Sequence, residues 1–215
     1  MIVTTEAIVL RARKQGETSK IVTLYTREYG KLNVIAKGAR EMKSKFGGAL
    51  EMFARSSLVF YKREKHDALQ LLSKAEVVDS NANILRSLKK MEAAMATVEL
   101  LLHAMHDEEA NRDLFEFLAG TFHSIAHADD AAAPTLQLRF YLGFAKEMGF
   151  EIDFNESREI SPRLLELLRQ LEQTSAFFSE AECHQLQSFF HAYFAEHLPG
   201  VSLRSMRSAK VFGQL

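Results

Sequence analysis

The first eighty residues consist of short apolar runs, rich in β-branched and aromatic residues, that are separated by turn residues. Runs of this kind and length predict β-strands. The sequence "EYGK" (28–31) indicates a tight hairpin turn in which Gly30 supplies a positive φ. The predicted strands occupy residues 4–13, 20–28, 31–38, 57–63 and 68–78.

Five short strands without a long helix between them favour a small closed barrel. The five-stranded Greek-key barrel, known as the OB-fold, fits a segment of this size best. Hydrophobic periodicity by itself leaves an SH3-like barrel as the alternative.

From Asn81 onward, apolar residues recur every three or four positions, which is the period of an α-helix. Ser161 before Pro162, and Ser179 three residues before Glu182, are start signals for two helices. Four later helices are predicted at 113–127, 135–149, 162–172 and 182–198. The first helix carries a stripe predicted to face the core, formed by Leu85, Leu88, Met91, Met95, Val98, Leu102 and Met105.

The chain is therefore predicted to be an α+β protein with two domains. A five-stranded OB-fold barrel, expected to bind nucleic acid, occupies residues 1–80. An all-α helical bundle, expected to bind partners, occupies residues 81–215.

The composition is that of an ordinary globular chain, with 215 residues, 47% hydrophobic residues and a formal net charge of -1. No apolar run approaches the length of a membrane span, and the N-terminus lacks the pattern of a signal peptide. Cys183 is the one cysteine, so neither an intramolecular disulfide nor a cysteine-based zinc cluster can form. We expect a cytoplasmic, nucleoid-associated protein that binds no cofactor.

The charge is distributed unevenly between the two halves. Residues 1–80 contain 15 Lys and Arg against 9 Asp and Glu, whereas residues 81–215 contain 12 against 19. Residues 11–45 alone contain 10 basic and 3 acidic side chains. This asymmetry indicates a basic module for a polyanion and an acidic module with another role.

The motifs of several enzyme classes are absent from the sequence, among them the phosphate-binding P-loop, G-x-S-x-G and H-E-x-x-H. Two histidine pairs share a helical turn, but a metal site needs further ligands, so a structural role is favoured for His103, His106, His123 and His127. Cys183 and His184 are adjacent and would point to different faces of a helix, which argues against a nucleophile and its base. We predict that the chain is not an enzyme and has no catalytic or metal-binding residue.

The segment from Val34 to Leu50 runs from the end of a predicted strand into a loop, and it combines cations with three glycines. OB-fold barrels bind single strands in grooves where cations follow the phosphates and aromatic rings stack on bases. Such cations imply backbone binding with little sequence preference; the alternative is a solvated surface. The candidate DNA-binding residues are Lys37, Arg40, Lys43, Lys45, Arg11, Arg13, Lys14, Arg27 and Lys31. The candidate stacking residues are Tyr25, Tyr29, Phe46, Phe53, Phe60 and Tyr61, with Phe53 and Phe60 expected to fill the barrel instead.

The stretch "GETSKIVTLYTREYGKLNVIAKGAR" (16–40), followed by "KSKFGGALEMF" (43–53), resembles the N-terminal domain of the RecO family of bacterial recombination mediators. The resemblance continues through "LFEFL" (114–118), "LRFYLGFAKEMGFEIDF" (138–154) and, weakly, "LRSMRSAKVF" (203–212). The matching N-terminal positions are Gly16, Glu17, Ser19, Thr26, Gly30, Ala36 to Arg40, Ser44, Leu50 and Phe53.

The resemblance implies an OB-fold and a helical domain that bind single- and double-stranded DNA and anneal complementary strands. It implies RecR as a partner and, indirectly, RecA, which is loaded on strands coated by single-stranded DNA-binding protein (SSB). Many relatives carry four cysteines as a zinc finger in the helical domain. Here Phe150 is followed by "EIDFNESREISP" without cysteine, so packing of Ile152 and Phe154 is expected to hold this segment.

RecO relatives also capture the acidic C-terminal tail of SSB with the helical domain, which requires an apolar pocket and a cation. Arg139 in "LRFYLGF" is the first candidate for that cation, and Arg112 is the second. The alternative is that Arg139 is an exposed residue of an amphipathic helix. For the whole chain, the alternative function is a protein–protein adaptor or regulator whose basic barrel binds an acidic partner instead of DNA.

Overall fold

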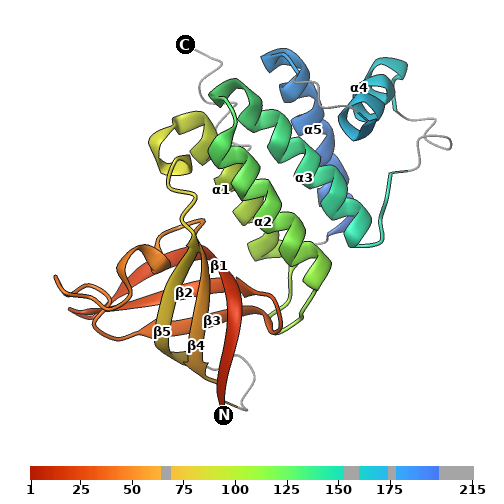
Figure 1. The fold of residues 1–215 in the computed structure, drawn as a ribbon. Coiled ribbons are helices and arrows are strands. Elements are labelled where there is room, and N and C mark those ends of the chain that lie inside the picture. Colours follow the sequence, from red (N-terminus) through yellow and green to blue (C-terminus); the bar gives the residue numbers. More distant parts are fainter. Residues whose placement is uncertain (64–68, 153–159, 174–177, 199–215) are drawn as a thin grey trace. The chain divides into compact units, whose positions relative to one another are not determined.

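The structure is a computed structural model, which describes residues 1–63, 69–152, 160–173 and 178–198 (Figure 1). The strands of the first half are β1 (Ile2–Gln15), β2 (Ser19–Thr26), β3 (Gly30–Ala36), β4 (Arg55–Tyr61) and β5 (Gln70–Asp79). The helices of the second half are α1 (Leu88–Ala104), α2 (Arg112–His127), α3 (Ala133–Glu147), α4 (Pro162–Gln173) and α5 (Glu180–His197). Three short 3-10 helices are η1 (Gly47–Leu50), η2 (Ile84–Arg86) and η3 (Asp130–Ala132).

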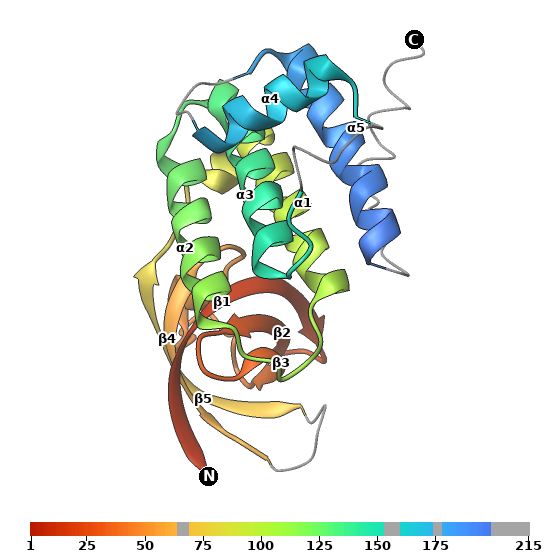
Figure 2. The same cartoon turned by 90° about the vertical axis from the view of Figure 1, so that its right-hand side faces the viewer.

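The five strands form a closed barrel in the order β1-β2-β3-β5-β4 (Figure 2). All neighbours are antiparallel except β3 and β5, which pair in parallel at Val34 and Gln70. This is an OB-fold-like barrel, and it confirms the predicted fold class. The hairpin turn at Gly30 is also confirmed, since its φ is 64°.

The barrel closes around an apolar core contributed by every strand and by the segment that joins β3 to β4. Phe60 lies in this core, as predicted, and Phe46 covers one part of it. The core consists of Val3, Ala7, Val9, Val22, Leu24, Leu32, Val34, Ala36, Phe46, Ala49, Leu50, Leu58, Phe60, Leu72 and Ala75. Because alternate residues of each strand enter this core, the remaining side chains face outward.

The chain divides into two compact units, and the first of them is discontinuous. It contains residues 1–83 together with 105–123, while the second contains 84–104 and the chain from 124 onward. Residues 105–123 therefore belong with the barrel, although they lie beyond the boundary expected at residue 80. The first turns of α2 pack on outward side chains of the barrel, with the Tyr25 and Phe115 rings stacked at 6.5 Å.

Ion pairs add to this attachment. Arg27 contacts Glu116 at 2.7 Å and Lys31 contacts Asp107 at 3.2 Å. The main chain contributes as well, since the N–H of Glu108 donates to the carbonyl of Lys31 at 2.8 Å. Burial raises the pKa of the Tyr25 hydroxyl, which keeps this group neutral beneath the α2 segment.

In the second unit, α3 packs against α1, α4 and α5. Tyr141 of α3 is fully buried; its ring meets Phe190 and Phe194 of α5 edge-on, and its hydroxyl donates to the carbonyl of Ala96 in α1 at 3.3 Å. Burial raises the pKa of this hydroxyl too. These contacts confirm the predicted helical bundle.

The prediction that the apolar stripe of α1 faces the core is wrong for the first half of the stripe. Leu85, Leu88, Met91 and Met95 are all exposed, with Leu88 at 66%. The buried face of α1 is instead formed largely by small residues, including Ala93, Ala94, Ala96 and Thr97, with Leu100 and Leu101. Small side chains let neighbouring helices approach closely, and hydrophobicity alone does not distinguish that face from a stripe of larger residues.

The expected capping box of α5 is present, because the Ser179 hydroxyl accepts from the Glu182 N–H and the Glu182 carboxylate accepts from the Ser179 N–H. Ile152 is buried, as expected, whereas Phe154 lies outside the described residues. Among the helices in the described ranges, none has the length and apolar character required to cross a membrane.

Candidate nucleic-acid interface

An arm of the barrel carries the first cations. The pairing of β1 with β4 ends at Ile8, but its pairing with β2 continues to Gln15 opposite Ser19. A β-bulge between Val9 and Arg11 shifts the register within this arm. After the bulge Ala12 packs against the barrel core, so Arg11 and Arg13 on either side of it face outward, and both are exposed.

Each of these two arginines lies at the start of a row of outward side chains that runs across β2 and β3. Arg11 lies opposite Thr23, which lies opposite Asn33, and the Thr23 hydroxyl donates to the Asn33 amide oxygen at 2.7 Å. Sequence reasoning missed Thr23 and Asn33. The two-residue alternation of the strands would have placed both beside Arg11, because directly opposed residues on one sheet face are neighbours.

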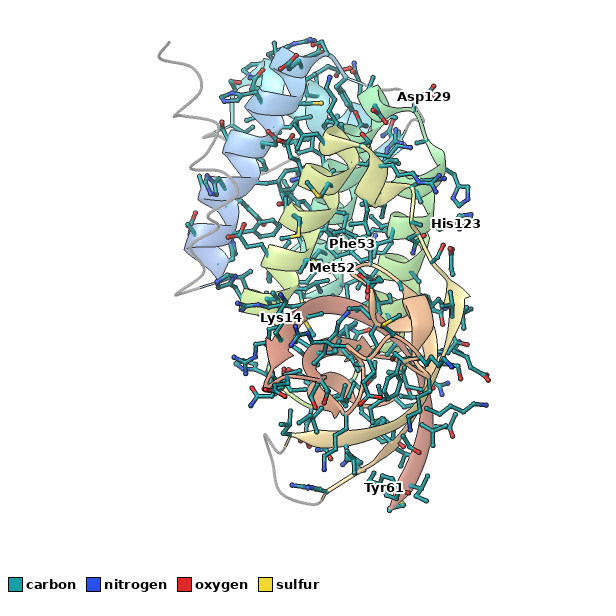
Figure 3. All side chains as sticks on the ribbon, turned by 90° about the vertical axis from the view of Figure 1, so that its left-hand side faces the viewer. Lys14, Met52, Phe53, Tyr61, His123 and Asp129 are labelled. Atoms are coloured by element: carbon teal, nitrogen blue, oxygen red, sulfur yellow. The ribbon has the colours of Figure 1, made fainter. Side chains whose placement is uncertain are left out.

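Lys14 lies near the tip of the arm, opposite Lys20, another cation that was not predicted. Lys20 forms an ion pair with Glu51 at 3.1 Å, whereas Lys14 is exposed. Figure 3 shows Lys14 and Tyr61 at opposite ends of the barrel. Lys14 therefore lies at the end of the barrel away from the exposed tyrosine (Figure 3).

The segment that follows β3 carries the second group of cations, Lys37, Arg40, Lys43 and Lys45, all of them exposed. Arg40 joins this group to the arm. Its N–H donates to Thr18 O at 2.8 Å, and its guanidinium Nη1 donates to Gly16 O at 2.9 Å and to Glu17 O at 2.7 Å. Arg40 therefore holds the loop against the β1–β2 turn and brings the two groups of cations together.

The loop is a series of tight turns with a buried anchor. The Glu41 N–H donates to Gly38 O at 3.2 Å, and the Ser44 N–H donates to Glu41 O at 3.0 Å. Gly38 has a φ of 73°, which favours glycine at this position. Phe46 is buried in the barrel core, and the Lys45 ammonium lies over its ring at 5.2 Å from the centroid.

Arg27 and Lys31 differ from the other candidate DNA-binding residues. Both are half-buried, and their charges contact the carboxylates of Glu116 and Asp107 described above. The aromatic candidates also divide. Tyr25, Phe46, Phe53 and Phe60 are buried, while Tyr29 is half-buried and Tyr61 is exposed. Phe53 does not fill the barrel as expected, because its ring packs against Phe122 of α2.

The two arginines predicted to bind a partner tail lie in different units. Arg139 is half-buried on α3 between the fully buried Leu138 and Phe140, and burial lowers the pKa of its guanidinium. Half-buried leucines lie three positions to either side of it, at Leu136 and Leu142. Arg112 begins α2 in the first unit.

Arg112 is exposed and contacts Glu28 at 3.4 Å. It therefore differs from Arg139 in burial, in its neighbours and in the compact unit to which it belongs.

Two of the four candidate histidines, His103 and His123, and the cysteine have contacts within the fold. His123 contacts Asp79 at 2.8 Å, and His103 contacts the carbonyl of Glu99 at 2.7 Å. Cys183 is buried near the Thr135 hydroxyl, and burial raises the pKa of its thiol. Over the described ranges, no group of three or more His, Cys, Asp or Glu could hold a metal ion.

An OB-fold-like barrel whose exposed cations converge from a hairpin arm and a glycine-containing loop has the features of a nucleic-acid-binding module. The family model described as "Recombination protein O N terminal" matches residues 1–81, and "Recombination protein O C terminal" matches residues 85–157. The chain belongs to the RecO family.

Curated relatives named DNA repair protein RecO agree with this assignment. The chain is 39% identical to the protein from Salinibacter ruber over 60% of this chain and 49% of the relative. It is 30% identical to that from Pelodictyon phaeoclathratiforme over 83% and 67%, and 32% identical to that from Chlorobium phaeobacteroides over 79% and 64%. The chain thus spans about half to two thirds of the length of these relatives.

Proposed function

We propose that this protein is a recombination mediator in DNA repair that binds single- and double-stranded DNA through the phosphate backbone. It would anneal complementary strands and, with RecR, help to load RecA on strands coated by SSB. Its role would consist of binding and positioning strands in the cytoplasm, without a catalytic residue. Membership of a DNA repair family supports this proposal.

The observation that carries the proposal is the set of three hydrogen bonds that Arg40 donates to the β1–β2 turn. These bonds hold the β1–β2 turn against the loop that follows β3, so cations from these separate segments would form one exposed surface. The interface would consist of Arg11, Arg13, Lys14, Lys37, Arg40, Lys43 and Lys45. Arg27 and Lys31, whose charges contact carboxylates, would instead hold α2 and the segment before it on the barrel.

Titration of the full-length chain with a single-stranded oligonucleotide at several salt concentrations tests this interface. If about four phosphates are neutralised, log affinity should fall with log salt at a slope of about -3, since each single-strand contact contributes roughly -0.7. The variant Lys37→Ala/Lys43→Ala should bind all sequences more weakly and show a flatter slope.

The control is Arg63→Ala/Lys74→Ala, which removes the same charge from β5 and from the segment that follows β4. Equal affinities and slopes for the two double variants would reject the proposed interface. Binding to an acidic polypeptide in place of DNA would favour the adaptor alternative.

We also propose that the helical unit captures the acidic tail of SSB at Arg139. The flanking Leu136 and Leu142 would contact the terminal aromatic ring, and the guanidinium would pair with the terminal carboxylate. Arg139→Ala should weaken tail-peptide binding by about 1.5–3 kcal/mol, the range for a hydrogen bond to a charged group.

Binding of bare DNA by the Arg139→Ala variant should be unchanged. Arg169→Ala on α4 is the matched control, because Arg169 is an exposed arginine of the same unit. If Arg112→Ala, but not Arg139→Ala, reduces peptide binding, the second candidate replaces the first.

A further inference from the structure

The basic loop carries an apolar side chain at its tip. Met42 is the most exposed large hydrophobic residue in the described part of the chain, with a relative exposure of 105%. It lies between Arg40 and Lys43, within the turns that connect Gly38 to Ser44. A methionine in this position gains no packing energy from the fold, so its apolar surface is available to a ligand.

The loop is held firmly on both sides of this methionine. On one side Arg40 makes three hydrogen bonds to the β1–β2 turn, and on the other Phe46 is buried in the barrel core. The one carboxylate of the loop lies close to Gly38, since a Cβ placed on Gly38 would lie 3.2 Å from the Glu41 Oε1. The loop therefore presents an apolar tip among cations.

We infer that Met42 inserts between the bases of a bound single strand and unstacks them. This inference rests on the proposed function, because the neighbouring cations must first bind the phosphates. Apolar side chains, methionine among them, act as wedges between base steps in other DNA-binding proteins. The flexible, polarizable thioether suits any base, so the wedge would add affinity without sequence preference.

A basic loop with an apolar tip could also enter the surface of an anionic membrane. DNA is favoured here because the loop is fastened to an OB-fold barrel whose outward arginines lie on the adjoining arm. Unstacked bases would also be available for pairing with an incoming strand. The wedge would therefore serve strand annealing directly.

The test uses the full-length chain and an adenine-rich single strand that contains 2-aminopurine, whose fluorescence rises when it is unstacked. Wild type should raise this fluorescence at saturation. Met42→Ala should abolish most of the rise and reduce affinity about threefold to tenfold, as expected for the loss of one apolar or stacking contact. Met42→Leu should restore both, and the salt slope should be the same in all three proteins.

Val78→Ala is the matched control, because Val78 is an exposed apolar residue of the same barrel that belongs to β5 and not to the basic loop. An equal fluorescence rise in wild type and Met42→Ala, both bound to DNA, overturns the inference but leaves the proposed function intact. Failure of wild type to bind DNA removes the proposed function and the inference with it. If Met42 is required for binding to phosphatidylserine vesicles but 2-aminopurine fluorescence does not change, the inference is overturned, and the ligand of Met42 is an anionic membrane instead of a single strand.

Discussion

The ring of Phe53 meets the ring of Phe122 edge-on, with the ring centroids 5.4 Å apart. Phe53 precedes β4 and adopts a φ of 69°, which is unusual for a residue with a side chain. Its N–H donates to Val9 O at 2.9 Å, and its carbonyl accepts from the Asn81 amide at 2.9 Å. Contacts from β1, from α2 and from the segment that follows β5 thus stabilise one strained residue.

Removal of this ring contact should destabilise the barrel unit. Phe122→Ala should lower the free energy of unfolding by about 3–5 kcal/mol, the usual result of truncating a buried aromatic residue. Denaturant unfolding followed by circular dichroism would measure the change. Phe189→Ala, which truncates a half-buried ring of the second unit, should have a smaller effect. Equal losses for the two variants would contradict the importance assigned to the contact.

Gly30 should not tolerate a side chain. A Cβ there would lie 2.2 Å from the carbonyl oxygen of Glu109, and the φ of 64° would also be unfavourable. Gly30→Ala should reduce stability by about 2 kcal/mol or more, since strain and a backbone clash act together. Gly48→Ala meets no atom within 4 Å and should be nearly neutral in the same thermal denaturation experiment. A stable Gly30→Ala protein would show that residues 105–123 do not approach the β2–β3 turn.

The exposed stripe of α1 should be insensitive to polar substitution. Leu88→Ser should change the free energy of unfolding by about 0.5 kcal/mol or less, as is usual on surfaces. Leu101→Ala, on the buried face of the same helix, should cost about 2–5 kcal/mol. The midpoints of urea unfolding of the two variants would measure both effects. A larger loss of stability for Leu88→Ser than for Leu101→Ala would show that the stripe lies in the core.

The capping box of α5 should contribute to stability in a pH-dependent way. The hydrogen bonds from Ser179 lower the pKa of the Glu182 carboxyl below its usual value. The stabilisation is therefore present above the pKa that Glu182 has in the unfolded chain, and it is lost as the pH falls through the lower pKa of the folded state.

Ser179→Ala should reduce stability by about 1 kcal/mol at neutral pH, the typical effect of removing an N-cap. It should also weaken the acid dependence, which thermal melts from neutral to acidic pH would reveal. A variant that loses stability equally at every pH would assign the effect to Ser179 alone.

Local patterns were sufficient to predict most elements. The alternation of the strands and the sequence "EYGK" predicted the barrel and its Gly30 turn, and Ser179 with Glu182 predicted the start of α5. The individual strands, the turn and the helix start depend on residues within a few positions of one another, so the sequence specifies them directly. Closure of the barrel does not, because it pairs β1 with β4 and β3 with β5.

The interface required information from residues far apart in the sequence. The hydrogen bonds from Arg40 to Gly16 and Glu17 join segments more than twenty residues apart, and no local pattern predicts them. The carboxylates that meet Arg27 and Lys31 come from α2 and the segment before it. The error in the predicted core face of α1 has the same cause. A face of small residues is buried only when another helix packs against it, and that helix comes from elsewhere in the sequence.

The discontinuous first unit affects how this protein folds as it emerges from the ribosome. At a synthesis rate of about 5–20 residues per second, the 43 residues between 80 and 123 take about 2 to 9 s to appear. During that interval all five strands exist, but Tyr25 and Phe53 lack the α2 rings that cover them. The nascent barrel would therefore expose these apolar side chains and be prone to aggregation during this interval. A chaperone that shields its outer surface would be needed only until α2 has been made.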